Sequence, residues 1–236
     1  QGDDLHDGPN LPTAPLNTDA IDNSAGVDTS DHEVNLKILL DMEVAGGRLS
    51  IEERNGLLRA MTDDVAEQVL DDNYRQNVVL GNARAQAPRL ITVHERFMQA
   101  LERSGRLDRH LERLPSDERI AELIERGEGL CGPELAVLLA YAKISLTAEL
   151  SAGTIGQDPW FSSVLRAYFP PALVERFPER LLEHPLRTSI IATVAGNEVI
   201  NLGGITFIFR VMEEMGATAE EAVRAAMVAM NVFGIR

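Results

Sequence analysis

The stretch that decides the fold is PELAVLLAYAKISL, residues 133–146. Pro133 suits the first turn of a helix, and the residues after it are apolar almost all the way round a helical cylinder. A helix of this kind needs neighbours on nearly every side to remove it from water. We therefore predict that residues 133–146 form a central buried helix in a mostly α-helical protein.

The segments on either side of this helix repeat the helical pattern. Leucines and β-branched residues recur every three or four positions, and each run is preceded by a residue that favours a helix start. The pair Gly46-Gly47 predicts the end of the first helix. The piece ITFIF, residues 205–209, has strand propensity, but no partner strand is evident, so we predict helix there too. The predicted helix starts are Ser30, Ser50, Thr62, Pro88, Ser116 and Thr218.

Composition excludes several classes of function. The chain has 236 residues and a formal charge of −15, which opposes binding to nucleic acid or to an anionic membrane. Cys131 is the only cysteine, which fits a reducing cytoplasm. The most apolar window, Ile190–Phe209, is interrupted by Asn197, Glu198 and Asn201. We interpret it as buried protein rather than a membrane span.

Residues 127–132, GEGLCG, match the dinucleotide-binding pattern G-x-G-x-x-G. That motif requires a strand before the glycines and a helix after them. The preceding segment, SDERIAELIERG, has helical spacing instead. We therefore predict a turn between two helices, with Cys131 as a small apolar filler in it.

Histidines and lysines offer few reactive groups. None of the five histidines pairs with another histidine or cysteine at metal-ligand spacing. The triplet Asp31-His32-Glu33 reads as a solvated first helical turn, and no metal site is expected. Lys143 lies in the apolar helix, where it should reach the surface or pair with an acid such as Glu149; a catalytic lysine of lowered pKa is the alternative.

Residues 23–33, NSAGVDTSDHE, combine a small-residue loop with a predicted helix start at Ser30. Ala25 and Gly26 permit a close backbone approach, and Ser30 with Glu33 has capping-box spacing. The free amides and the helix dipole would favour a carboxylate there. The pattern alone indicates an anion-binding helix start as one open possibility.

The same residues resemble a motif of the glutamate dehydrogenases, N-A-G-G-V-x-x-S-x-x-E, and more closely its form in the very large bacterial NAD-specific enzymes. The likeness extends over residues 16–236 through patches at 36–40, 133–141, 184–187 and 204–207. The resemblance implies that Asn23 contacts the ribose of NAD on its nicotinamide side and that Gly26 and Val27 shape this cofactor-binding loop. It implies that Ser30 contacts the side-chain carboxylate of glutamate. Ala25 stands where glycine is usual in the commoner pattern.

By this resemblance, residues 16–45 are the C-terminal edge of an α/β catalytic domain, a loop plus a helix, and residues 46–236 are a multi-helix C-terminal region. Residues 1–15 read as a flexible lead-in or an artificial remnant. The implied reaction is oxidative deamination of L-glutamate to 2-oxoglutarate and ammonia with NAD. No catalytic residue is assigned, because the family's catalytic lysines and aspartate have no counterpart here, and the isolated chain should be inactive and bind NAD weakly.

Two further hypotheses stay open. In the first, the chain is a non-catalytic helical module whose role is homo-oligomerisation, since it carries many apolar stripes and no complete active site. In the second, the helical region holds a regulatory small-molecule site, for which the sequence indicates no residues.

Overall fold

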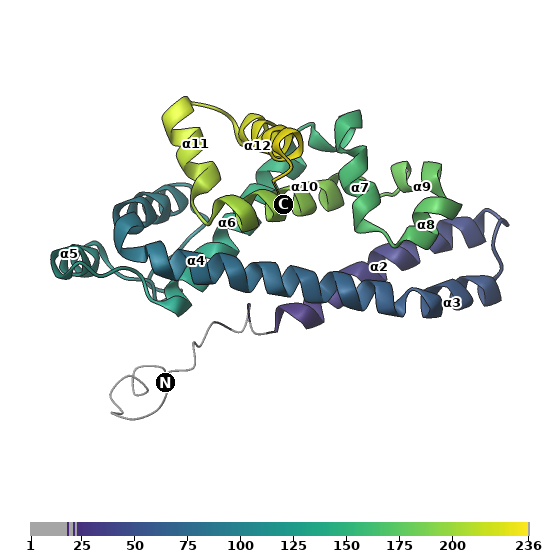
Figure 1. Cartoon of the computed structure of the whole chain (residues 1–236), viewed down its shortest axis with the longest axis horizontal. Coiled ribbons are helices and arrows are strands. Elements are labelled where there is room, and N and C mark those ends of the chain that lie inside the picture. The colour runs from purple at the N-terminus through teal and green to yellow at the C-terminus, as the bar shows by residue number, and fades with distance from the viewer. Residues whose placement is uncertain (1–17, 19–20, 22, 236) are drawn as a thin grey trace, which may run out of the picture.

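A computed structural model describes residues 18, 21 and 23–235, and within these residues it contains helices and no strand. Figure 1 shows the long helix α4 running the length of the molecule, with α2 and α3 beside it. The predicted lead-in at residues 1–15 lies outside the described residues. The α-helices are α2 Ser24–Ala45, α3 Ile51–Ala60, α4 Thr62–Arg103, α5 Asp117–Arg126, α6 Gly132–Ala152, α7 Ser162–Tyr168, α8 Pro171–Arg176, α9 Pro178–Leu182, α10 Arg187–Gly203, α11 Phe207–Met215 and α12 Ala219–Phe233.

Helix α6 lies at the centre, as predicted. Its leucines Leu135, Leu138 and Leu139 are fully buried, and the helix packs against α4, α10 and α12. By length and composition α6 could also cross a membrane, although its leucines are buried within the fold and Ile144 is exposed. The predicted apolar window 190–209 bends by 91° between α10 and α11, so it is not one straight helix.

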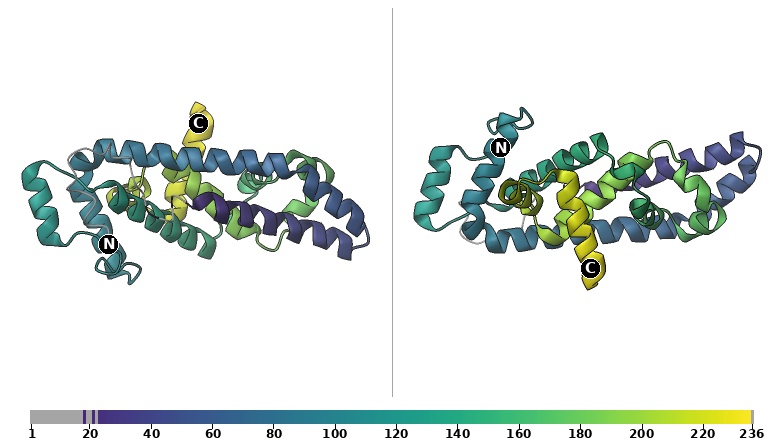
Figure 2. Two further views of the ribbon diagram at one scale, coloured as in Figure 1. Left: turned by 90° about the horizontal axis from the view of Figure 1, so that it is seen from below. Right: turned by 90° about the horizontal axis from the view of Figure 1, so that it is seen from above.

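Helices α2, α3 and α4 form the layer beside α6. Both further views show α2 running alongside α4 (Figure 2). We expected a new helix at Pro88, and this is wrong because Pro88 lies inside α4. A helix can continue through proline at a cost of about 3 kcal/mol. Burial of Ala87 and Ile91 around Pro88 offsets that cost.

Local signals at the other helix starts had mixed success. Ser50 and Thr218 head capping boxes, as predicted, and Ser116 caps α5. The prediction that Thr62 caps a helix is wrong, since Met61 occupies the N-cap position of α4 and makes no side-chain hydrogen bond there. The segment at residues 205–209 is helical from Phe207 onward and contains no strand.

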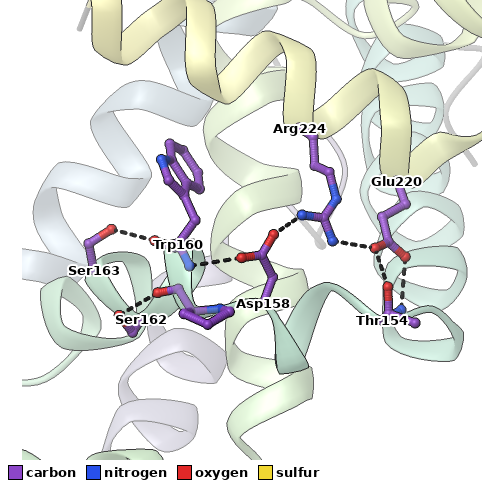
Figure 3. Close-up of polar contacts among 8 residues, drawn as sticks. Thr154, Asp158, Trp160, Ser162, Ser163, Glu220 and Arg224 are labelled. Carbon is purple, nitrogen blue, oxygen red and sulfur yellow. Dashed lines mark hydrogen bonds and ion pairs between the residues drawn. The ribbon is translucent and has the colours of Figure 1, made fainter.

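Helix α12 is fastened to the segment that follows α6. Arg224 forms ion pairs with Asp158 and Glu220, and Glu220 accepts hydrogen bonds from the backbone and hydroxyl of Thr154 at 2.8 and 2.7 Å (Figure 3). The guanidinium of Arg224 also lies 5.6 Å from the ring centre of Phe161. These contacts fix the α12 face that covers α6 and α10.

The glycine pattern at residues 127–132 forms a helix–helix turn, as predicted, and its glycines have structural roles. Gly127 ends α5 with a φ of 67°, a left-handed conformation that favours glycine. Gly129 lies against the backbone of α4, where a Cβ would sit 2.3 Å from the carbonyl carbon of Ala87. The close approach of this turn to α4 therefore requires glycine at position 129.

Replacing Gly129 should destabilise the fold through this contact. The added methyl of Gly129→Ala would meet backbone atoms, which cannot rotate away, so we expect a loss of about 1–3 kcal/mol in the free energy of unfolding. Gly81→Ala is the matched control, because nothing lies within 4 Å of its added Cβ, and it should gain about 0.5–1 kcal/mol. Urea unfolding followed by circular dichroism measures both, and equal stabilities would contradict this packing.

Buried histidines should make the fold sensitive to acid. His94 is 1% exposed and its Nδ1 has no hydrogen-bond partner. Burial lowers the pKa of His94 from 6.5 to about 4. The unfolded chain therefore binds more protons than the folded chain between these values, and stability is lost as the pH falls from about 6.5 to about 4.

The variant His94→Leu should remove most of this loss. Between pH 7 and pH 4 the parent should lose about 3 kcal/mol more unfolding free energy than the variant does. His110→Leu is the control, since His110 is exposed, and it should retain the acid sensitivity of the parent. Urea titrations at several pH values provide the comparison, and parallel curves for parent and His94→Leu would argue against a neutral buried His94.

Candidate functional site

The motif at residues 23–33 is helical rather than a loop. Helix α2 begins at Ser24, with Asn23 at the cap position, so the predicted helix start and capping box at Ser30 are wrong. Ser30 Oγ donates to the carbonyl of Gly26 at 3.1 Å, one turn back. The hydroxyl of Ser24 meanwhile bonds to the Ile21 carbonyl and to Asn73 of α4. These contacts at Ser24 fix the chain earlier than the local pattern indicated.

The four site residues predicted from the sequence share one face of α2. Asn23, Gly26, Val27 and Ser30 are spaced by three or four positions, which aligns them on a helix, and all four are exposed. Val34 continues this face and is 51% exposed, whereas the opposite side of α2 is buried. A ligand or another protein segment can therefore reach all four from the same side.

The side chain of Asn23 lies across Gly26. A Cβ at position 26 would come within 3.2 Å of Asn23 Oδ1, so glycine leaves room for the amide. Helix α2 thus presents the Asn23 amide, the backbone of Gly26 and the Ser30 hydroxyl along one exposed face.

A cavity of about 540 Å³ adjoins this face. Asn23 and Val27 line it, whereas Gly26 and Ser30 do not. This cavity is not evident from the sequence, because four helices that are distant along the chain form its walls. The remaining lining residues are Ser24, Asp28 and Asp31 from α2, Asp72, Asn73 and Gln76 from α4, Lys143 from α6, and Thr193, Asn197 and Asn201 from α10.

Charges in the cavity perturb one another and are poorly hydrated. Burial first, and then the neighbouring Asp72 and Asp31, raise the pKa of Asp28 to about 6. Burial lowers the pKa of Lys143 to about 8, against the opposing attraction of Asp72 and Asp28. Lys143 Nζ donates to Gln76 Oε1 at 3.1 Å. The cavity therefore holds one ammonium, Lys143, and one carboxyl group, Asp28, whose pKa values both lie near neutral pH.

The contacts of Lys143 and the exposure of Cys131 differ from the sequence predictions. Lys143 does not pair with Glu149, which bonds to Arg106 at 2.5 Å instead. Cys131 is exposed at the start of α6 rather than an apolar filler of the turn, and partial desolvation of its thiol raises the pKa to about 11. A raised pKa disfavours the thiolate, so the structure does not support a reactive cysteine.

His32 is buried rather than solvated, which corrects the prediction of an exposed first turn. It is 3% exposed and stacks on Tyr168 with ring centres 4.4 Å apart. Asn35 donates to the Tyr168 hydroxyl at 2.8 Å, and His184 Nε2 lies 3.1 Å from the Asn35 carbonyl. Since a carbonyl only accepts, His184 donates through Nε2. This network holds α2 against α7 and the turn before α10.

Comparison with known proteins identifies related sequences along most of the chain. Residues 10–83 match the family described as bacterial NAD-glutamate dehydrogenase, catalytic domain, and residues 127–236 match glutamate dehydrogenase, C-terminal. The catalytic-domain match thus extends past residue 45, where we expected that domain to end, and includes half of α4. The division of the chain at residue 45 stays a prediction.

Individual relatives are similar over nearly the whole chain. The NAD-specific glutamate dehydrogenase of Mycobacterium tuberculosis is 44% identical over 220 residues, 93% of this chain, and that of Halomonas elongata is 42% identical over 218 residues, 92% of it. The same enzyme of Pseudomonas aeruginosa is 42% identical over 229 residues, 97% of this chain. In each case the chain spans 14% of the relative's length. The chain therefore belongs to the bacterial NAD-specific glutamate dehydrogenases and is homologous to their C-terminal region.

Proposed function

We propose that this chain is part of an NAD-dependent glutamate dehydrogenase and that the exposed α2 face formed by Asn23, Gly26, Val27 and Ser30 is one wall of its active site. The supporting observation is that these four motif positions, which we expected in a loop leading to a helix start, share one exposed helical face. The proposed reaction is oxidative deamination of L-glutamate to 2-oxoglutarate and ammonia. The wall would be completed by parts of the enzyme outside this chain.

Ser30 would position the substrate through its hydroxyl. The hydroxyl now donates to the Gly26 carbonyl, so it must rotate away to donate to a carboxylate. In an α-helix that carbonyl also accepts the backbone N–H of Ser30, and it stays satisfied after the rotation. The switch is therefore inexpensive, and a hydrogen bond to a charged group is stronger than one to a carbonyl.

Asn23 fits a role beside the cofactor. Its amide is exposed and makes no capping bond within α2, so both its oxygen and its nitrogen are able to meet ribose hydroxyls. NAD would supply the acceptor for the hydride released from the substrate carbon. This chain would contribute orientation only, because Lys37 pairs with Glu33 on the surface and Lys143 lies inside the cavity.

The first test replaces Ser30 in the full-length enzyme. Ser30→Ala should lower kcat/KM for glutamate and leave KM for NAD unchanged. The loss of transition-state stabilisation should be about 1–3 kcal/mol, the scale of one hydrogen bond to a charged group. Thr29→Ala is the matched control: Thr29 is adjacent, exposed and bonded one turn back to the Ala25 carbonyl at 2.7 Å, but it lies off the proposed wall. Steady-state kinetics with both substrates measures the effect.

A result in which Ser30→Ala and Thr29→Ala behave alike would remove Ser30 from the substrate wall. A larger effect on KM for NAD than on glutamate would move Ser30 to the cofactor side. Circular dichroism of both variants checks that loss of the hydroxyl leaves α2 folded.

A second candidate function, oligomerisation, is favoured by the outer face of α12. Val228, Val232 and Phe233 are 46%, 71% and 76% exposed and line a hollow of about 610 Å³. Large apolar side chains grouped in this way often mark contacts between proteins. We propose that a second copy of the chain covers this face.

Light scattering coupled to size-exclusion chromatography tests this proposal. The parent chain should elute as a dimer or larger, and Phe233→Asp should shift it to a monomer, because a carboxylate placed in an apolar contact is costly. Leu70→Asp is the control, since Leu70 is 69% exposed on α4 and lies away from α12. A parent chain that stays monomeric over a wide concentration range would rule out this face as a self-association site.

A further inference from the structure

We propose that Asp28, His32 and Asp72 form a binding site for a divalent transition-metal ion at the base of the cavity between α2 and α4. The proposal is independent of the dehydrogenase role, because it uses other residues and needs no substrate. It also departs from the sequence-based expectation of no metal site, which treated His32 as solvated.

Helical spacing and helix packing bring the three side chains together. Asp28 and His32 are four residues apart on α2 and therefore share a face, and Asp72 approaches from α4. One possible ligand atom from each residue lies within 4.8 Å of the others. Around one ion with bonds of about 2.0–2.2 Å, such atoms would be about 3–4 Å apart. A modest contraction of flexible side chains would therefore complete the site.

His32 is the observation that separates this cluster from ordinary surface acids. The imidazole is 97% removed from solvent, with 3% exposed, and its Nδ1 has no hydrogen-bond partner. Its Nε2 lies 3.9 Å from Asp28 Oδ1, too far for a hydrogen bond. Stacking on Tyr168 fixes the ring plane. A buried imidazole that makes no hydrogen bond is costly, and a metal ion bound at Nε2, the nitrogen nearer Asp28, would give the ring a polar partner while Nδ1 stays without one.

One of the two carboxylates, Asp28, is also incompletely hydrogen-bonded. Asp28 Oδ2 is buried and has no hydrogen-bond partner, while Asp72 is exposed on the open side of the cluster. A cation bound between them would neutralise charges that now repel each other across the cavity. The cavity itself, about 540 Å³ in volume, leaves room for water ligands and a route from solvent.

The donor set selects the kind of ion. One imidazole nitrogen and two carboxylate oxygens suit Zn²⁺ or Mn²⁺, whereas Mg²⁺ and Ca²⁺ prefer oxygen ligands alone. Three protein ligands also leave at least one position open toward the cavity. We therefore take Zn²⁺ as the probe and Mg²⁺ as the ion that should not compete.

Lys143 is the internal competitor for this site. Its ammonium lines the same cavity and is attracted by both Asp72 and Asp28, yet its hydrogen bond goes to Gln76. The ammonium therefore offsets part of the negative charge of the two carboxylates. Removing this charge should strengthen binding of a cation.

Isothermal titration of the 236-residue chain with ZnCl₂ tests the proposal, after dialysis against chelating resin. We expect one Zn²⁺ per chain, undisturbed by millimolar Mg²⁺. His32→Gln and Asp72→Asn should each weaken binding at least tenfold, whereas His110→Gln and Asp71→Asn, which change an exposed histidine and the neighbouring acid, should leave it unchanged. Lys143→Met should tighten binding at least threefold. Circular dichroism identifies variants that remain folded.

Several outcomes would overturn the proposal. The absence of stoichiometric Zn²⁺ binding would show that there is no site. Equal affinities in His32→Gln and His110→Gln, or no gain in Lys143→Met, would place the ion elsewhere. If a variant at position 32 unfolds, the comparison of Asp72→Asn with Asp71→Asn decides alone. None of these results bears on Ser30, so failure here is distinguishable from failure of the dehydrogenase assignment.

Discussion

Helix α6 must be covered on nearly every side, and the positions of α4, α10 and α12 follow from that requirement. All its leucines are buried, and Leu135, Leu138 and Leu139 are completely so; each buried leucine contributes about 1.5–3 kcal/mol relative to exposure. The same packing carries one lysine, Lys143, toward α2 and α4. A helix that is apolar almost throughout thus fixes the core and also delivers an ammonium to the polar cavity, which α10 completes with Asn197 and Asn201.

Two sets of contacts hold helix α2 in place. One set ties it to α4 through Ser24 and Asn73; the other ties it to α7 through His32, Asn35 and Tyr168. These contacts leave the side that carries Ser30 in solvent. A positioning wall needs rigid support behind exposed groups, and the buried network supplies that support without using any residue of the wall.

Local sequence rules succeeded where the chemistry is local. The capping boxes at Ser50 and Thr218 formed as expected because both partners lie within one turn. The same pattern failed at Ser30, since a serine hydroxyl can bond back to the previous turn instead, and the distant Asn73 fixed the helix start earlier. Pro88 failed for a similar reason, because burial around it outweighed a local preference. Only contacts between distant segments could have decided either case.

The same distinction between local and distant contacts applies to the candidate site. The residues of the proposed wall could be named from the sequence because a resemblance transfers position by position and needs no knowledge of packing. The cavity was not found, because Lys143 and Asp72 belong to different helices and their encounter with Asp28 depends on how α4 crosses α2 and α6. Neither a lone lysine in an apolar run nor a pair of acids in a polar run indicates a partner. Their chemistry arises only when the core brings them together, so the sequence pattern of each helix by itself does not reveal it.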